Sequence, residues 1–236
     1  MIEMKTGIPW KRYSSEGVII VLSILLAFGV DAWWDRLEQK GYQDELLSRI
    51  ESALIENVKL VDARIEGASR IEEPLYSFLE MDSGAFGIIS NTRTRLIIDT
   101  LIKPYTSTFN NDNLLSLFSN ENSTLALDAD LQDSIAVWRK QMNSVAVIRE
   151  QLIWVEREVA KALGNSPEIR PFMGSYDIDT LTVSAGAEAI RAAIDNSEAM
   201  SLANAKLMYL GIYANALTNL KRESESLQSI VSSLVK

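Results

Sequence analysis

The chain contains no cysteine and no histidine among its 236 residues. Without cysteine it has no disulfide, no thiol nucleophile and no thiolate metal ligand. Without histidine it lacks the side chain that serves most often as general acid–base catalyst and as metal ligand. Only carboxylate, lysine, tyrosine or serine–lysine chemistry is left for catalysis. We therefore expect a protein that is not an enzyme and that holds no cofactor and no metal.

Glycine and proline are also scarce, with 11 and 5 residues, which favours long regular elements. The formal net charge is -9, and the only basic cluster in the sequence is the short group of Lys5, Lys11 and Arg12. Because nucleic-acid phosphates are bound by clustered lysine and arginine, we expect no nucleic-acid partner. Hydrophobic residues make up 47% of the chain, which is enough for a sizeable core.

The longest uncharged apolar run lies near the N-terminus, between Val18 and Val30. Extended to Gly17–Trp34, it gives about 27 Å of helix, close to the hydrocarbon thickness of a bilayer, about 30 Å. A cleaved signal peptide would need small residues at its end, where this chain has Trp33 and Trp34. A surface helix of a soluble bundle would have a polar face, which the run lacks. We therefore predict a retained transmembrane helix whose tryptophans lie at the headgroup level.

This prediction divides the chain into a basic tail (1–16), a transmembrane helix (17–34) and a soluble helical bundle (35–236). The positive-inside rule counts lysine and arginine in short flanks, so the basic tail is predicted to lie in the cytoplasm. The expected location is the bacterial inner (cell) membrane, with a single span and the C-terminal domain on the periplasmic, extracytoplasmic side. The lipid bilayer is thus an expected partner.

Two features of the span have a possible functional interpretation. Asp31 is either an ionisable group inside the membrane, lining a pore or pairing with a partner helix, or an interfacial residue with its carboxylate in water. We favour the interface, because Asp35 follows one turn later on the same face. Ser23 and Ala27 form a small-xxx-small pair, which lets two helices approach closely. The residues assigned to the anchor are Gly17, Ser23, Ala27, Gly29, Asp31, Trp33 and Trp34.

Apolar residues recur at three- and four-residue steps in three long segments, about 35–81, 129–163 and 197–235. Pro74 is expected to kink or restart the first of them. The predicted fold is all-α, with the transmembrane helix continuing into an antiparallel bundle of long helices with short helical inserts. The apolar side of the last helix is predicted to consist of Leu202, Ala205, Met208, Ile212, Leu217, Leu220, Leu227, Val231 and Leu234.

Capping residues mark the inserts and the middle helix. We expect Asn91 or Thr92 to cap one short helix, Asn110 or Asn111 to cap another, and Asp128 to cap the long helix that follows. Asp128, Asp130 and Asp133 lie close together but lack the spacing of a calcium loop, so we interpret Asp128 as a cap.

The segment 165–185 is irregular and precedes a short helix expected over Ala187–Ile194. If this segment covers a ligand between the helices, its polar contacts would be Arg170 and Tyr176.

Two groups of residues follow a pattern that we associate with one family: Glu16, Gly17, Asp31 and Trp33 around the apolar run, and Asn113, Leu114, Leu117 and Leu131 in the middle of the chain. In this respect the sequence resembles an uncharacterised family (a domain of unknown function) of small single-pass bacterial membrane proteins. Trp34 departs from the usual asparagine-rich end of that family's anchor. The resemblance implies a single span and a helical extracytoplasmic domain, and it implies no activity.

Three functions fit these observations. The one we favour is a non-enzymatic membrane-anchored scaffold or accessory subunit, which binds a protein partner or forms homo-oligomers through its bundle. Trp138 and Trp154 lie on the same long helix, and we expect at least one of them outside the core. The alternative is an extracytoplasmic ligand-binding or sensor module. A further alternative is a pore-forming membrane effector with Asp31 and Ser23 facing the lumen.

Overall fold

The computed structural model describes residues 10–81, 89–105, 112–119, 127–173, 181–182 and 184–235, and it describes side chains in the first helix from Val21 onward. These residues form helices and turns and contain no strand, so the predicted all-α class is confirmed. The long helices are α1 (Trp10–Leu79), α5 (Ala129–Gly164) and α7 (Ser197–Leu234). The short ones are α2 (Asn91–Ile102), α3 (Asp112–Ser119), the 3-10 turn η2 (Arg170–Phe172) and α6 (Ala185–Asp195).

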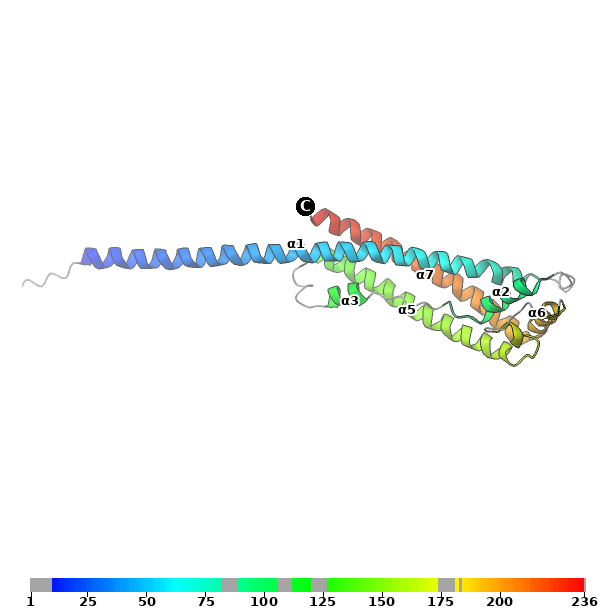
Figure 1. Cartoon of the computed structure of the whole chain (residues 1–236). Helices are drawn as coiled ribbons and strands as arrows, with labels where there is room; N and C mark the ends of the chain where they lie inside the picture. Colours follow the sequence, from blue (N-terminus) through cyan, green and yellow to red (C-terminus); the bar gives the residue numbers. More distant parts are fainter. Residues whose placement is uncertain are drawn as a thin grey trace, which may run out of the picture.

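Helix α7 is the centre of the bundle, because it packs along both α1 and α5 (Figure 1). Ser224 of α7 bonds Asn57 of α1, with 3.0 Å between the oxygens, and accepts a bond from the Trp138 indole of α5 at 2.9 Å. Nearer the start of α7, Lys206 pairs with Glu156, further along α5. On α1, Lys221 pairs with Asp62 at 2.7 Å, so a lower number in α7 again meets a higher one in its neighbour. Helix α7 is therefore antiparallel to both α1 and α5, and these two point the same way.

The short helices α2 and α3 occupy the fourth position of this bundle. Because α1 and α5 are parallel, the chain between them must return along the bundle, and α2 and α3 lie on that return path. Helix α2 packs against both α1 and α5, and α3 packs against α1 at the other end (Figure 1). Phe118 of α3 meets Trp138 of α5 edge to face, with ring centroids 5.4 Å apart. The result resembles a four-helix bundle in which one helix is divided into two short pieces.

The core follows the predicted stripes of α1 and α5 but not that of α7. Ile50, Leu54 and Val61 of α1 are fully buried, and so are Leu131, Trp138, Val155 and Val159 of α5. In α7, by contrast, Met208 and Ile212 are exposed, at 55% and 41%. The predicted apolar side of α7 was wrong in this first half, since the buried face there contains Ala203, Lys206, Leu210 and Tyr213. Counting only apolar side chains missed that face because a lysine and a tyrosine belong to it.

Pro74, where a kink or a restart was predicted, lies inside α1, which continues to Leu79, so the helix does not restart there. A proline inside a helix removes one backbone hydrogen bond. Here Leu75 and Phe78 follow it and are each 1% exposed, so packing into the core holds the last turns in place.

Two of the predicted caps can be compared with the structure. Asp128 caps α5 as predicted, its carboxylate accepting from the Leu131 amide at 2.8 Å. The cap of α2 is Ser90, whose hydroxyl accepts from the Arg93 amide at 3.3 Å, and not Asn91 or Thr92. Asn91 instead contacts the start of α6 and the residues before it, donating to Thr182 O at 3.2 Å and accepting from the Gly186 amide at 3.1 Å. Asn110 and Asn111 lie outside the described residues.

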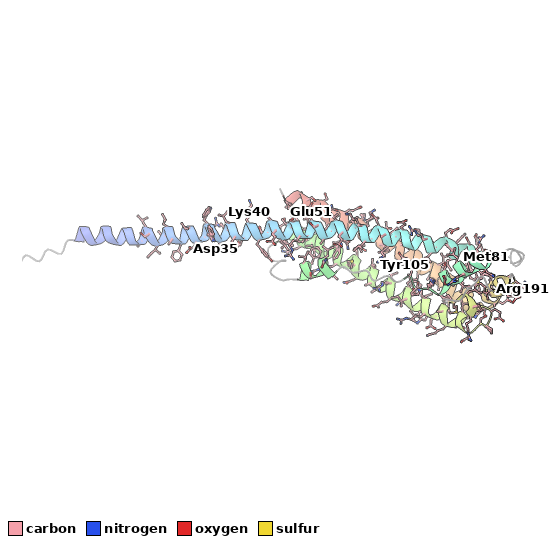
Figure 2. The ribbon with its side chains drawn as sticks, in the orientation of Figure 1. Asp35, Lys40, Glu51, Met81, Tyr105 and Arg191 are labelled. Carbon is pink, nitrogen blue, oxygen red and sulfur yellow. The ribbon has the colours of Figure 1, made fainter. Side chains whose placement is uncertain are left out.

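The first part of α1 extends far beyond the bundle as a single helix, whereas the second part packs within it (Figure 1). Every residue from Val21 to Tyr42 is exposed, and burial begins at Leu46 and Leu47. Figure 2 shows Asp35 and Lys40 on the part of α1 that leads out of the bundle. The end of α7 and helix α3 lie at this same end of the bundle (Figure 1).

Candidate functional site

The predicted anchor residues lie together on the protruding part of α1. Val21, Leu22, Ile24, Leu25, Leu26, Phe28 and Val30 are all at least half exposed there. Trp33 and Trp34 are 59% and 63% exposed, with ring centroids 6.5 Å apart. A side chain added at Gly29 would meet nothing within 4 Å. Within this chain, the described bundle therefore does not cover these residues.

Among the described residues, no helix has a stretch both long enough and apolar enough to cross a bilayer. The predicted span begins at Gly17, and the side chains of residues 17–20 lie outside the described part of the chain.

The two predicted ligand contacts are not brought together by the described structure. Arg170 is exposed in the short turn η2, next to the buried Phe172, and Tyr176 lies outside the described residues. Trp154 is 57% exposed whereas Trp138 is fully buried, so the expectation that at least one of these two tryptophans lies outside the core is confirmed.

A groove of about 430 Å³ lies at the end of the bundle from which α1 leaves it. Arg36, Lys40 and Leu47 line it from α1, Leu131 lines it from α5, and Leu234 from the end of α7. Its walls combine two cationic side chains with two carboxylates, Asp44 and Asp128, beside an apolar floor.

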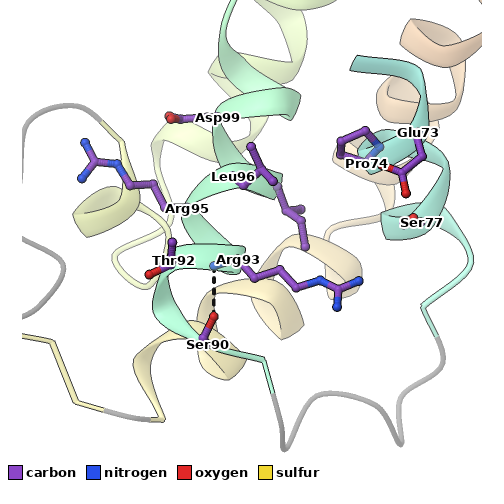
Figure 3. Close-up of a pocket in the computed structure, with 10 residues that line it drawn as sticks. Glu73, Pro74, Ser77, Ser90, Thr92, Arg93, Arg95, Leu96 and Asp99 are labelled. Atoms are coloured by element: carbon purple, nitrogen blue, oxygen red, sulfur yellow. Dashed lines mark hydrogen bonds between the residues drawn. The ribbon is translucent and has the colours of Figure 1, made fainter. Parts of the chain in front are cut away.

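A second cavity, of about 630 Å³, lies between the end of α1 and helix α2. Figure 3 shows Arg93 extending from α2 toward the turn of α1 that carries Glu73 and Ser77, while Arg95 points to the other side. Hydroxyl groups and both signs of charge line it beside apolar groups such as Leu96. This lining suits a small polar molecule.

The most buried charges of the described structure form a pair, Lys206 of α7 and Glu156 of α5, which are 0% and 2% exposed. The Lys206 ammonium donates to the carbonyl oxygens of Thr100 and Lys103 at 2.8 and 3.0 Å, and it lies 3.3 Å from Glu156 Oε1. The same carboxylate oxygen accepts from the Tyr105 amide at 2.8 Å. A cation is favoured at the C-terminus of a helix, where carbonyl groups lack partners. The pair therefore fastens the end of α2 to α5 and α7.

Burial lowers the pKa of Lys206, and the Glu156 carboxylate opposes this shift. The neighbouring ring of Tyr105 packs edge to face with Tyr213, and its hydroxyl donates to the carbonyl of Arg64. Burial raises the pKa of Tyr105 to about 12 and also raises that of Tyr213. Because these groups are held by packing and by backbone partners, we interpret them as a structural layer of the bundle.

Sequence reasoning missed this layer, although a signal was present. Lys206 stands three residues after Ala203 and four before Leu210, so it occupies a core step of α7, and Glu156 stands next to Val155 in the buried stripe of α5. A lysine and a glutamate at core steps of antiparallel neighbours predict a buried pair.

The described residues contain no group of three or more acidic side chains placed to hold a metal ion. No protein family, no curated protein and no solved structure matches this chain. The family resemblance noted above therefore stays a prediction, and the function has to be argued from the chain itself.

Proposed function

We propose that this protein is a non-enzymatic, membrane-anchored helical scaffold or accessory subunit. In this proposal the N-terminal part of α1 lies in the bilayer of a bacterial cell membrane, and the bundle acts outside it through protein–protein contacts or oligomerisation. The observation that carries it is the exposed apolar run from Val21 to Trp34 on a helix that continues unbroken into the bundle.

The protruding part of α1 leaves a large apolar area exposed to solvent. Covering one large aliphatic or aromatic side chain stabilises a protein by about 1.5–3 kcal/mol. For the seven large apolar side chains between Val21 and Val30, which are half to three-quarters exposed, this amounts to on the order of 10 kcal/mol. A bilayer supplies that cover, and Trp33 and Trp34 would then meet the headgroups, with Asp31 and Asp35 reaching water.

The bundle contributes the contact surface in this proposal. Val147 and Trp154 are 60% and 57% exposed and stand seven residues apart on α5, so they share a face. Surface tryptophans are enriched where proteins bind one another.

Membrane retention of two matched variants tests the anchor. Leu22→Arg/Leu26→Arg is expected to move most of the protein into the soluble fraction after an alkaline carbonate wash, because each central arginine costs about 2.5–3.5 kcal/mol on insertion. Leu96→Arg/Leu115→Arg, at two exposed positions of the bundle, is expected to leave the protein in the membrane pellet. Release of both variants, or of neither, would contradict the anchor.

Crosslinking in mild detergent tests the scaffold role, with the expected result of a defined oligomer or partner complex that Trp154→Ala weakens. A monomer without partners would contradict it.

The cavity between α1 and α2 favours a second candidate, the ligand-binding module, because its volume of about 630 Å³ lies in the range of small-molecule sites. That function predicts a metabolite that raises the melting temperature of the wild type but not of Arg93→Ala. A metabolite screen without any such stabilisation would remove this candidate.

A further inference from the structure

The protruding part of α1 carries an apolar stripe that continues past the tryptophans. Val30, Trp34 and Leu37 follow one another at steps of four and three residues, and they are 53%, 63% and 46% exposed. Gly41 comes next in the same pattern, and a side chain added there would meet nothing within 4 Å. Asp44, at the following step, ends the stripe. Alternating steps of three and four residues are the repeat with which two helices pack along each other. We call these four residues, from Val30 to Gly41, the α1 stripe.

The α1 stripe faces away from the bundle of its own chain. At about 100° per residue, it lies on the side of α1 roughly opposite to Ile50, Leu54 and Val61, which face the core. No other described helix accompanies the protruding part of α1 (Figure 1). A second helix can therefore lie along the stripe without meeting the bundle of the same chain.

The charges beside the stripe favour a second copy of α1 in parallel orientation. In a parallel pair, a residue that flanks the stripe on one helix lies beside the residue five positions later on the other helix. Lys40 flanks Gly41, so in such a pair it lies beside Glu45 of the second copy. Neither Lys40 nor Glu45 forms an ion pair or a side-chain hydrogen bond with a described residue of its own chain. Trp33 lies in the same way beside Glu38 of the second copy, so no like charges meet there.

Membrane anchoring orients two copies in the same way. With both N-termini on one side of the bilayer, the two α1 helices are parallel wherever the copies meet, which is the orientation that pairs Lys40 with Glu45. Toward the N-terminus the same face of α1 continues through Ala27 and Ser23, whose small side chains permit close approach of two helices in a bilayer.

We propose that the protein forms a parallel homodimer through the α1 stripe. Two equivalent ion pairs between Lys40 and Glu45 set the register of the two helices, and the two bundles lie on the outer sides of the pair. The proposal rests on the membrane anchor proposed above. It adds a contact between two copies that is separate from the exposed face of α5 around Trp154.

Disulfide crosslinking in native membranes tests the stripe, because the chain has no cysteine of its own. Leu37→Cys and Gly41→Cys each place one thiol on the stripe, and we expect both variants to form disulfide-linked dimers on mild oxidation. Arg36→Cys and Gln39→Cys, which lie on other sides of the same turns, are the matched controls and should stay monomeric. Equal crosslinking at all four positions, or crosslinking at none, overturns the dimer.

Exchange of charges tests the register. Lys40→Glu replaces two ion pairs by two like-charged pairs, and we expect the dissociation constant of the dimer in detergent to rise about fivefold or more. Lys40→Glu/Glu45→Lys restores opposite charges and should return the constant to the wild-type value. Lys140→Glu, at an exposed position of α5, makes the same charge change in the bundle and should leave it unchanged. Sedimentation equilibrium measures all four proteins, and a double variant as weak as Lys40→Glu overturns the proposed pairing.

Failure of the dimer and failure of the anchor are recognised separately. Protein that stays in the membrane pellet after the carbonate wash but remains monomeric on oxidation contradicts the dimer alone. Protein that leaves the membrane in the wash contradicts the anchor. Circular dichroism of each variant confirms that the helices are intact.

Discussion

The two parts of α1 belong to one unbroken helix but have opposite surroundings. From Val21 to Tyr42 every residue is exposed and most of the first ten are apolar, whereas Ile50, Leu54 and Val61 further along are completely buried. Helix formation therefore does not distinguish the two parts. The two parts differ in what covers their apolar side chains. In the second part these side chains pack against α7, whereas no described element of the chain packs against the first part. Each prediction below compares a substitution within the bundle with a matched substitution in the exposed part of α1.

The largest difference is expected for lysines. Lys206→Met leaves the buried Glu156 carboxylate without its cation, and we expect a loss of about 3–5 kcal/mol in the free energy of unfolding. Lys40→Met, in the exposed part of α1, is expected to change it by less than about 0.5 kcal/mol. Urea unfolding followed by circular dichroism measures both. Lys206→Met/Glu156→Leu removes both charges and should recover most of the loss, and a double variant no more stable than the single one would contradict the pair.

Leucine truncation should show the next largest contrast. Leu54→Ala removes a fully buried side chain, and we expect a loss of about 2–5 kcal/mol in the free energy of unfolding. Leu25 is 61% exposed, and Leu25→Ala should leave the same quantity nearly unchanged in detergent solution. Equal losses in the two variants would show that the first part of α1 is packed against protein after all.

Two glycines make a smaller and sharper contrast. A Cβ at Gly186 would lie 2.7 Å from Thr94 Oγ1 and 2.8 Å from Asn91 Oδ1, so Gly186→Ala should destabilise the bundle by about 1–3 kcal/mol. At Gly29 the space is open, and Gly29→Ala should raise helicity slightly, since alanine is favoured over glycine by about 1 kcal/mol. Melting temperatures are expected to fall only for Gly186→Ala, and the opposite order would contradict the contact between α2 and α6.

The smallest effect concerns alkaline pH. Burial raises the pKa of Tyr105 to about 12, against about 10 in the unfolded chain, so its contribution is complete below pH 10 and is lost as the pH rises toward 12. Wild-type stability should therefore fall more steeply over this range than that of Tyr105→Phe. Tyr42→Phe, at a 46% exposed position of α1, is the control and should follow the wild type. Parallel curves for all three proteins would contradict the buried state of Tyr105.

Much of the fold could be predicted from the sequence because most of the long helices repeat a single apolar stripe. The observed α5, Ala129–Gly164, ends one residue beyond the predicted segment, and its cap Asp128 was predicted from its position before that stripe. The first half of α7 was mispredicted because its buried face includes Lys206 and Tyr213. Their burial depends on Glu156 and Tyr105, which lie far away in the sequence.

The arrangement of α2 and α3 could not be predicted from periodicity. Both helices are short, and their position follows from the need to fill the space between the parallel helices α1 and α5, which only the whole bundle defines. The groove at Arg36 was missed for the same reason, because its walls come from α1, α5 and the end of α7. Arg170 was chosen from an irregular segment, and such a segment by itself gives no position in space.

The most direct test of the central claim is cysteine labelling in membranes. Because the chain has no cysteine, a single introduced thiol is the only target for a membrane-impermeant maleimide. We predict that Ser23→Cys and Ala27→Cys are protected in intact membranes and react only after detergent is added, whereas Gln39→Cys reacts in sealed vesicles whose extracytoplasmic face is outward. Equal labelling of all three positions in such vesicles without detergent would show that the N-terminal part of α1 lies in water, and it would contradict the membrane anchor.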